Sequence, residues 1–392
     1  MPQSQGIRIG RILGIPIFLD VSWILVFALF TWSLYSQFAG DEHIHWTPSE
    51  KWTIALITSL LFFGSVVFHE LAHSVVAQRY KIKVLSITLF LFGGLARIAR
   101  EPSKPVQEFN IAIAGPLASG FLSILFYGLV LAVPSEIVRN SAGILAYLNG
   151  TLALFNLLPG FPLDGGRIFR ALVWGATKDF SRATRVAGAS GKLIAYIMIA
   201  LGILSFVAGR QPGSSFEWVS RYGGPWLAFI GWFLLVAAQA SVAQVTIRET
   251  LAGLTAADVM SHEVPTIPGN MSLPEYSGEV LRTGRRIHIV TMDDRLVGLM
   301  HVAALNTVPR DEWDMNSVQA VMVPREKILW ASPEEPLQRV LERLMAADVN
   351  QMPVVSHTDD GAAHIIGMIT REAILRVIQT RSELGAALTN NR

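Results

Sequence analysis

Two histidines and a glutamate stand close together inside an apolar stretch of the sequence. Residues 66–73 read VVFHELAH, so His69 and His73 are four residues apart and Glu70 follows the first histidine directly. On a helix, residues i and i+4 share one face about 5–6 Å apart, so both imidazoles can reach one cation. A catalytic zinc site takes three protein ligands and a water. The spacing predicts zinc at His69 and His73, with Glu70 placed to hydrogen-bond the attacking water.

The same pattern also occurs by chance in soluble helices, where it binds nothing. Here it lies in an apolar run long enough to cross a membrane, where charged residues such as Asp, Lys or Arg cost at least about 2.5 kcal/mol each and usually mark function. The chain has no cysteine, so any metal must be held by His, Asp or Glu. The setting therefore favours a metal site.

A third ligand is predicted from a later segment, NLLPGFPLDGGR at residues 156–167. Its two prolines and three glycines break the helix, and they put Asp164 at the end of an apolar run, at a depth that the two histidines can reach. Taken alone, an Asp-Gly pair at this place indicates a turn. Together with the histidine pair, Asp164 is predicted to complete the metal site.

Long apolar runs indicate the elements that position these residues. Charged residues make up 16% of the 392 residues and mean hydropathy is +0.42, whereas soluble domains carry about 25% charged residues. Six runs approach the roughly 20 residues that a membrane crossing needs. They are Ile15–Ser36, Trp52–Gln78, Phe109–Val133, Ser141–Leu158, Leu193–Val207 and Pro225–Val245.

Basic residues predict the direction of these spans, because cytoplasmic loops are enriched in Lys and Arg. They gather before the first span, between the second and third (residues 79–104) and after the fourth (residues 167–192), whereas the intervening loops are poor in them. We expect a cytoplasmic N-terminus and a cytoplasmic C-terminal part. From Arg248 onward charge density rises and short strands alternate with helices, which predicts a soluble α/β domain.

These motifs resemble the site-2 protease family of intramembrane zinc metalloproteases, in the branch that carries cystathionine-beta-synthase-type (CBS) domains. The resemblance covers essentially the whole chain. It is carried by FHELAH at 68–73, FGGLARI at 92–98, AIAGPLAS at 112–119 and NLLPGFPLDGGR at 156–167. The chain departs from the family at Ser119, where many relatives have Asn.

The resemblance implies a role for each matching residue. His69, His73 and Asp164 would bind one catalytic Zn²⁺, and Glu70 would be the general base. Asn156 looks like the asparagine that stabilises the oxyanion, and residues 87–98 look like a membrane-dipping hairpin that captures substrate. The residues expected to contact the substrate are Gly93, Gly94, Pro159 and Pro162.

The C-terminal part repeats itself with a period of about 60–70 residues. Met260, His301 and the stretch 286–290 are echoed by Met322, Thr370 and 351–355, which resembles a pair of CBS motifs. Such pairs typically bind adenosine nucleotides. Here Ala304 and Ala373 stand where nucleotide-binding relatives have Asp for the ribose, so a nucleotide site and a purely structural dimerisation or docking module are both left open.

We therefore expect a polytopic α-helical membrane bundle of about six transmembrane helices, followed by a soluble α/β CBS pair. The expected boundaries are 1–246 for the protease domain, 247–254 for a linker, 255–380 for the CBS pair (255–310 and 317–378) and 381–392 for a flexible tail. The expected activity is hydrolysis of a membrane-protein substrate in or near a transmembrane segment of a prokaryotic cell membrane, in signalling. A homodimer through the CBS pair is expected, and a nucleic-acid partner is not. The alternatives are a CBS-regulated transporter or channel and an inactive scaffold.

Overall fold

The computed structural model describes residues 6–41, 44–91, 93–208, 223–292, 295–357 and 363–390. Contacts divide the chain into two units, Met1–Val245 and Thr246–Arg392. We call them the N-terminal unit and the C-terminal unit and describe each by itself. Phe92, the first residue of the predicted FGGLARI motif, lies outside the described residues, as do the last two residues of the predicted tail.

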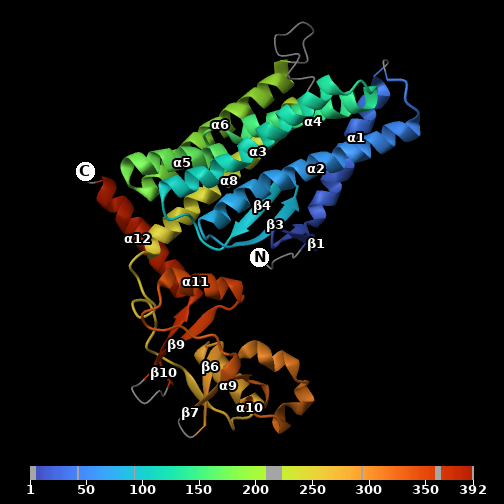
Figure 1. Ribbon diagram of the computed structural model, residues 1–392. Coiled ribbons are helices and arrows are strands. Elements are labelled where there is room, and N and C mark those ends of the chain that lie inside the picture. Colours follow the sequence, from blue (N-terminus) through green and yellow to red (C-terminus); the bar gives the residue numbers. More distant parts are fainter. Residues whose placement is uncertain are drawn as a thin grey trace. The chain divides into compact units, whose positions relative to one another are not determined.

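The N-terminal unit consists of helices packed side by side and one small sheet (Figure 1). The helices are α1 (Val21–Gly40), α2 (Pro48–Arg79), α3 (Pro105–Ala132), α4 (Glu136–Asn156), α5 (Asp164–Thr177), α6 (Phe180–Ala208) and α8 (Gly224–Leu251). Local sequence sets where the helices begin: Asp20 accepts a hydrogen bond from Ser22 N–H at the start of α1, and Thr47 and Glu50 form a capping box at the start of α2. Such caps satisfy backbone N–H groups that have no partner within the helix.

Five helices in the described part of the chain are long and apolar enough to span a membrane: α1, α2, α3, α6 and α8. The prediction of a helical membrane bundle is confirmed, but the number six is not. The predicted fourth span falls in α4, which has 21 residues and includes Glu136, Arg139 and Asn149. These polar residues explain why α4 is less hydrophobic than the other five.

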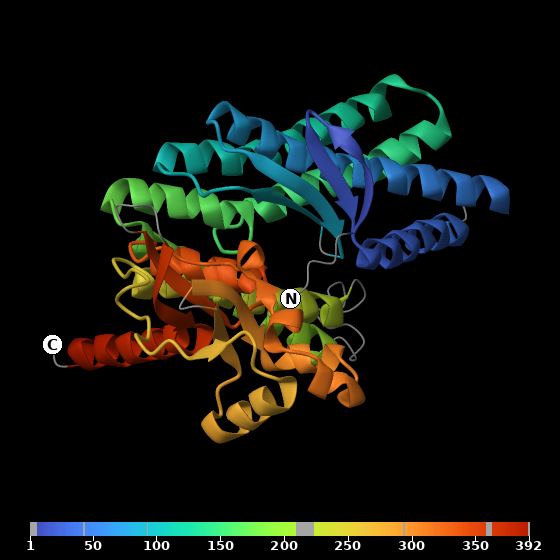
Figure 2. The same cartoon turned by 90° about the horizontal axis from the view of Figure 1, so that it is seen from below.

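A four-stranded sheet lies against the helices, and its strands run in the order β1-β2-β3-β4 (Figure 2). The strands are β1 (Ile7–Ile12), β2 (Ile15–Leu19), β3 (Val84–Phe90) and β4 (Gly93–Ile98). The predicted first span was wrong at its start, because residues 15–19 form strand β2, whose residues 17–19 pair in parallel with β3, Ile17 opposite Ile87. Ile15 and Ile87 are buried in one cluster with Ala77 of α2 and Ile111 of α3. The sheet is thereby fixed to the two helices.

The region 167–192, expected to be a basic loop, is helical. Helix α5 and the first part of α6 cover it, separated only by Lys178 and Asp179. Arg170 is 8% exposed and belongs to the interior of the N-terminal unit. Arg170 was counted among the basic loop residues because residues 167–192 are too polar to be recognised as helical from hydrophobicity alone.

The C-terminal unit has two similar halves. The first contains β5 (Thr266–Pro268), α9 (Leu273–Thr283), β6 (Ile287–Met292) and β7 (Arg295–His301), and the second contains α11 (Leu337–Ala346), β9 (Gln351–His357), β10 (Ala363–Thr370) and α12 (Arg371–Asn390). The connection between them includes 3-10 helices at Val302–Thr307, Arg310–Met315 and Arg325–Lys327, with α10 (Val318–Val321) and β8 (Val323–Pro324). Helix α8 extends into the predicted linker, and α12 extends to residue 390.

Equivalent positions of the two halves make equivalent contacts. Gly298 approaches Met322, and Gly367 approaches Met260, so closely that a Cβ at either glycine would collide with the methionine sulfur. His301 accepts a hydrogen bond from Ala303 N–H at 2.9 Å, as Thr370 does from Ala373 N–H at 3.0 Å. Each half therefore packs its last strand against the first segment of the other, in line with the repeat seen in the sequence.

Candidate metal centre

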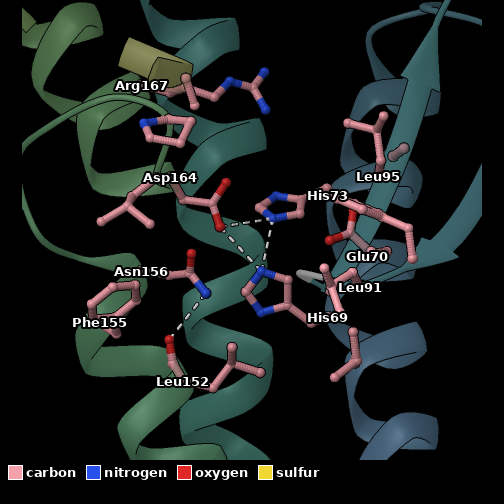
Figure 3. A pocket seen from close by; sticks show the side chains of 18 of the residues that line it. His69, Glu70, His73, Leu91, Leu95, Leu152, Phe155, Asn156, Asp164 and Arg167 are labelled. Carbon is pink, nitrogen blue, oxygen red and sulfur yellow. Dashed lines mark hydrogen bonds and ion pairs between the residues drawn. The ribbon is translucent and has the colours of Figure 1, made fainter. Parts of the chain in front are cut away.

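Helix α2 carries three of the predicted site residues. His69 and His73 are one turn apart and are only 4% and 6% exposed. Both rings point away from the sheet toward α3 and α5, whereas Glu70 lies on the side of β4 (Figure 3). The spacing of the motif thus puts both imidazoles on one face of the helix and the carboxylate beside them.

Asp164 comes from the first position of α5 and not from the end of α4, where the sequence had put it. Its Oδ2 lies 3.1 Å from Nε2 of His69 and 3.1 Å from Nε2 of His73. The two Nε2 atoms are 3.2 Å apart. The structure therefore brings together the three predicted ligands, whose donor atoms form one compact group.

The turn between α4 and α5 explains the glycines of the DGGR segment. Only residues 157–163 interrupt the helices, so Gly165 and Gly166 lie inside the first turn of α5 and do not break it. A Cβ at Gly165 would collide with the carbonyl groups of residues 157 and 158, and one at Gly166 with the backbone of residues 160 and 161. The glycines are needed because the turn folds back onto the helix that carries Asp164.

Helix α3 holds both histidine rings from behind. Nδ1–H of His73 donates to the carbonyl oxygen of Ile111 at 2.6 Å, and Nδ1 of His69 lies 2.9 Å from Oγ of Ser119. A backbone carbonyl only accepts, so Nδ1 of His73 carries the proton and the Nε2 lone pair faces Asp164. A metal-binding histidine usually has such a partner on its other nitrogen.

Gly115 lies on the same face of α3, between Ile111 and Ser119. A Cβ at this position would fall inside contact distance of Nε2 of both histidines. The roles of positions 111 and 115 were missed by the sequence analysis, which noted Ser119 only as a departure from the family. Their four-residue spacing in IAIAGPLAS, residues 111–119, is the signal that could have found them, since 111, 115 and 119 share a helix face.

The donor set fits a zinc ion. Zinc bonds to nitrogen and oxygen are about 2.0–2.2 Å, so tetrahedral ligand atoms are about 3.3–3.5 Å apart. The three separations here are 3.1, 3.1 and 3.2 Å. Two imidazoles and a carboxylate leave a fourth tetrahedral position free, as a catalytic site requires.

A cavity of about 620 Å³ opens beside these donors. Glu70 and Asn156 both line it, and Asn156 lies next to Asp164 (Figure 3) with its Nδ2 donating to the Leu152 carbonyl at 3.1 Å. Of the predicted substrate contacts, Gly93, Gly94 and Pro162 line the cavity. Pro159 is exposed, and its carbonyl accepts a hydrogen bond from Ser190.

A buried ion pair that the sequence did not predict joins α3 to the helix that begins at Asp164. Glu108 of α3 is completely buried and pairs with Arg170 of α5. Nε of Arg170 donates to Oε1 of Glu108 at 2.7 Å. No spacing rule connects two residues that are 62 positions apart, so only the fold could reveal the pair.

Comparisons with known proteins identify the family of the chain. The model of Peptidase family M50 matches residues 57–141 and 132–205, and that of the CBS domain matches residues 318–380. Two relatives carry the name zinc metalloprotease. The protein sll0528 of Synechocystis sp. is 32% identical over 387 residues, which cover 96% of each chain. The protein Rip3 of Mycobacterium tuberculosis is 34% identical over 380 residues, which cover 95% of this chain and 93% of the relative. The solved structure of a site-2 protease from Methanocaldococcus jannaschii is 30% identical, covers 60% of this chain and 94% of that chain, and has a TM-score of 0.41.

Proposed function

Because the chain belongs to peptidase family M50, the site-2 zinc metalloproteases, we propose that it cleaves membrane proteins at the site formed by His69, Glu70, His73 and Asp164. The observation that carries the proposal is the convergence of two buried imidazole nitrogens and one carboxylate oxygen within 3.2 Å, beside a cavity between helices. His69, His73 and Asp164 hold the zinc ion. Glu70 is the base and Asn156 an oxyanion donor.

The residues around the ion divide the work of peptide hydrolysis. Zinc, when bound, acts as a Lewis acid and lowers the pKa of a water molecule to about 7. Glu70 takes the proton of the attacking water and then delivers it to the leaving nitrogen. The Asn156 side-chain N–H lies across the site from Glu70 and stabilises the negative charge that develops on the substrate carbonyl oxygen.

The substrate has to be unwound before it can be cut. A transmembrane helix hides its peptide bonds in internal hydrogen bonds, and free backbone is tolerated in a membrane only where protein or water satisfies it. Strand β4 is the last strand of its sheet, and Gly93, Gly94 and Leu95 line the cavity. We propose that β4 receives the unwound segment as an added strand. Gly94 packs so closely on Glu70 that any side chain there would collide with it, which keeps the strand next to the base.

Exchange of Glu70 for Gln tests the proposal. The full chain is purified in detergent and incubated with single-span membrane proteins, and zinc content and cleavage are measured separately. Glu70→Gln should keep a full equivalent of zinc and lower the cleavage rate by about 10²–10⁴-fold, the usual contribution of a general base. Cleavage at the wild-type rate would refute the assignment of the base. Wild-type protein that binds zinc and cuts none of the substrates would support an inactive scaffold.

Glu50→Gln is the matched control, because it makes the same change at the other end of α2. Gln can replace Glu in a capping box, so this variant should keep both zinc and activity. A similar loss in both variants would mean that the change acts through the stability of α2.

The C-terminal unit is proposed to regulate cleavage from the cytoplasm, in signalling. Ala304 and Ala373 offer no carboxylate for a ribose, and His301 and Thr370 already cap the segments that follow them. These contacts favour a docking or dimerisation module over a nucleotide site. Titration of the full chain with ATP and AMP tests this: saturable binding that changes the cleavage rate would establish a nucleotide-regulated module. Protease accessibility in sealed membrane vesicles tests the cytoplasmic placement.

A further inference from the structure

A buried pair of opposite charges lies next to the candidate metal centre without being part of it. Glu108 is in the first turn of α3 and is 0% exposed, and Arg170 of α5 is 8% exposed. Charged residues inside a membrane unit are rare and usually functional. Removing one partner of a buried pair leaves an uncompensated charge, which is strongly destabilising. Neither residue has a part in the hydrolysis proposed above.

Arg170 contacts one residue that precedes Asp164 in the chain, one that follows it, and one of α3. Its Nε and Nη2 both donate to Oε1 of Glu108. Its guanidinium carbon lies 4.9 Å from the ring centre of Phe161 and 4.7 Å from that of Phe180. Phe161 belongs to the turn just before Asp164, and Arg170 belongs to the helix that Asp164 begins. One side chain therefore holds the turn, the Asp164 helix and α6 together.

The other end of this contact is the helix that orients both histidines. Glu108, Ile111, Gly115 and Ser119 follow one another at spacings of three and four residues, so they share one face of α3. Ile111 and Ser119 hold the histidine rings. Glu108 lies on the same face of α3 and binds Arg170 of α5.

We propose that Glu108 and Arg170 are positioning residues that set the Asp164 carboxylate against His69 and His73, so that one face of α3 orients all three ligands. The inference rests on the proposed function, since it assigns a purpose to the pair only if the three residues bind zinc. The pair acts through Asp164 and touches neither substrate nor metal.

The test measures zinc affinity of the detergent-purified full chain by competition with a chelator. Loss of a group that orients a metal ligand typically lowers affinity about 10–100-fold, so Glu108→Gln should weaken zinc by that factor. Glu108→Asp keeps the charge and should recover part of the loss. Ser123→Ala is the control: it removes another contact of α3, the hydrogen bond from Ser123 Oγ to the Ala146 carbonyl at 2.7 Å, and should leave zinc affinity unchanged.

A double-mutant cycle separates positioning from general packing. In a chain that already carries Asp164→Asn, Glu108→Gln should cause almost no further loss of zinc affinity, because its effect passes through the missing carboxylate. An equal loss in both backgrounds would overturn the inference. If Glu108→Gln does not fold, Arg170→Lys is measured in the same cycle, since it keeps the charge but loses the forked contact.

The two hypotheses fail differently. If the wild-type chain binds no zinc, the proposed function fails. If the wild-type chain binds zinc and a folded Glu108→Gln or Arg170→Lys variant binds it equally well, only the positioning role fails.

Discussion

Buried polar side chains distinguish the two units of the chain. In the N-terminal unit they include His69, His73, Glu108, Ser119 and Asn149, whereas among the described residues of the C-terminal unit the only buried polar side chains are His288 and the phenol of Tyr276. Lipid surrounds the first unit, so polar groups can be satisfied only inside it. The core clusters of the second unit are apolar, and none of its described Asp, Glu, Lys or Arg side chains is buried.

The two units also differ in whether a structural role is filled twice. In the C-terminal unit His301 and Thr370 do the same task at equivalent positions with different side chains. In the N-terminal unit His69 and His73 are each oriented by a different group, the Ser119 hydroxyl and the Ile111 carbonyl. Substitutions should therefore have large effects at the polar groups of the first unit and small effects at the caps of the second.

The largest effect is expected when a candidate ligand is removed. Asp164→Ala should weaken zinc binding by more than the roughly 100-fold that a change behind a ligand can cause, because the third donor itself is lost. Elemental analysis and chelator competition measure it. A full equivalent of zinc bound at wild-type affinity would contradict the role of Asp164 as a ligand. It would also contradict the expectation that substitutions of polar groups have the larger effects in the N-terminal unit.

A substitution that fills the space beside the imidazole rings of His69 and His73 should impair zinc binding nearly as much. The new methyl group of Gly115→Ala would fall where both Nε2 atoms face Asp164, so zinc content and cleavage should both be lost. Gly128→Ala on the same helix is the matched control, because a Cβ there meets nothing within 4 Å. Alanine in place of a helical glycine stabilises by roughly 0.5–1 kcal/mol, so the control should be at least as stable as wild type. Full zinc loading of Gly115→Ala would show that the rings can move apart.

A smaller effect is expected behind His69. Ser119→Ala removes the hydroxyl that lies 2.9 Å from Nδ1 and leaves that nitrogen without its partner. Zinc affinity should fall about tenfold, the lower end for such groups, and Ser119→Thr, which keeps a hydroxyl, should recover it. If Ala and Thr give the same affinity, the hydroxyl does not orient the ring.

The smallest effect is expected in the C-terminal unit, on acidification. Burial lowers the pKa of His288 and of His301 below the ordinary value of 6.5, and Arg286 adds to the effect at His301. Below pH 6.5 the unfolded chain takes up protons that the folded unit resists, so stability is fully present above that pH and is lost as pH falls. Hydrogen exchange of the C-terminal peptides in the full chain, corrected for the intrinsic effect of pH, should show weaker protection at pH about 5.5 than at about 7.5.

His301→Thr sharpens this prediction. It copies the cap of the second half and removes one titrating group, so protection of the 301–307 segment should depend less on pH. An unchanged dependence would assign the effect to His288 alone.

Most of the site could be predicted from residues that are close together in the sequence. The i, i+4 histidine pair, the glutamate beside it and the proline-rich turn before Asp164 are local features, and so are the repeats of the C-terminal unit. The first span was misjudged because apolar residues 15–19 suit a strand as well as a helix. Helices α5 and α6 were missed over residues 167–192 because their polar stretches look like a loop when their packing is unknown.

The sequence by itself determined which residue types could bind the ion, which family the chain resembles and where its charge-rich part begins, because these depend on neighbours along the chain. Only the tertiary structure decided that Asp164 starts a separate helix, that α3 supports both rings and that Glu108 pairs with Arg170. These contacts join residues dozens of positions apart, and inside an apolar surrounding each polar group is stable only where the fold supplies its partner.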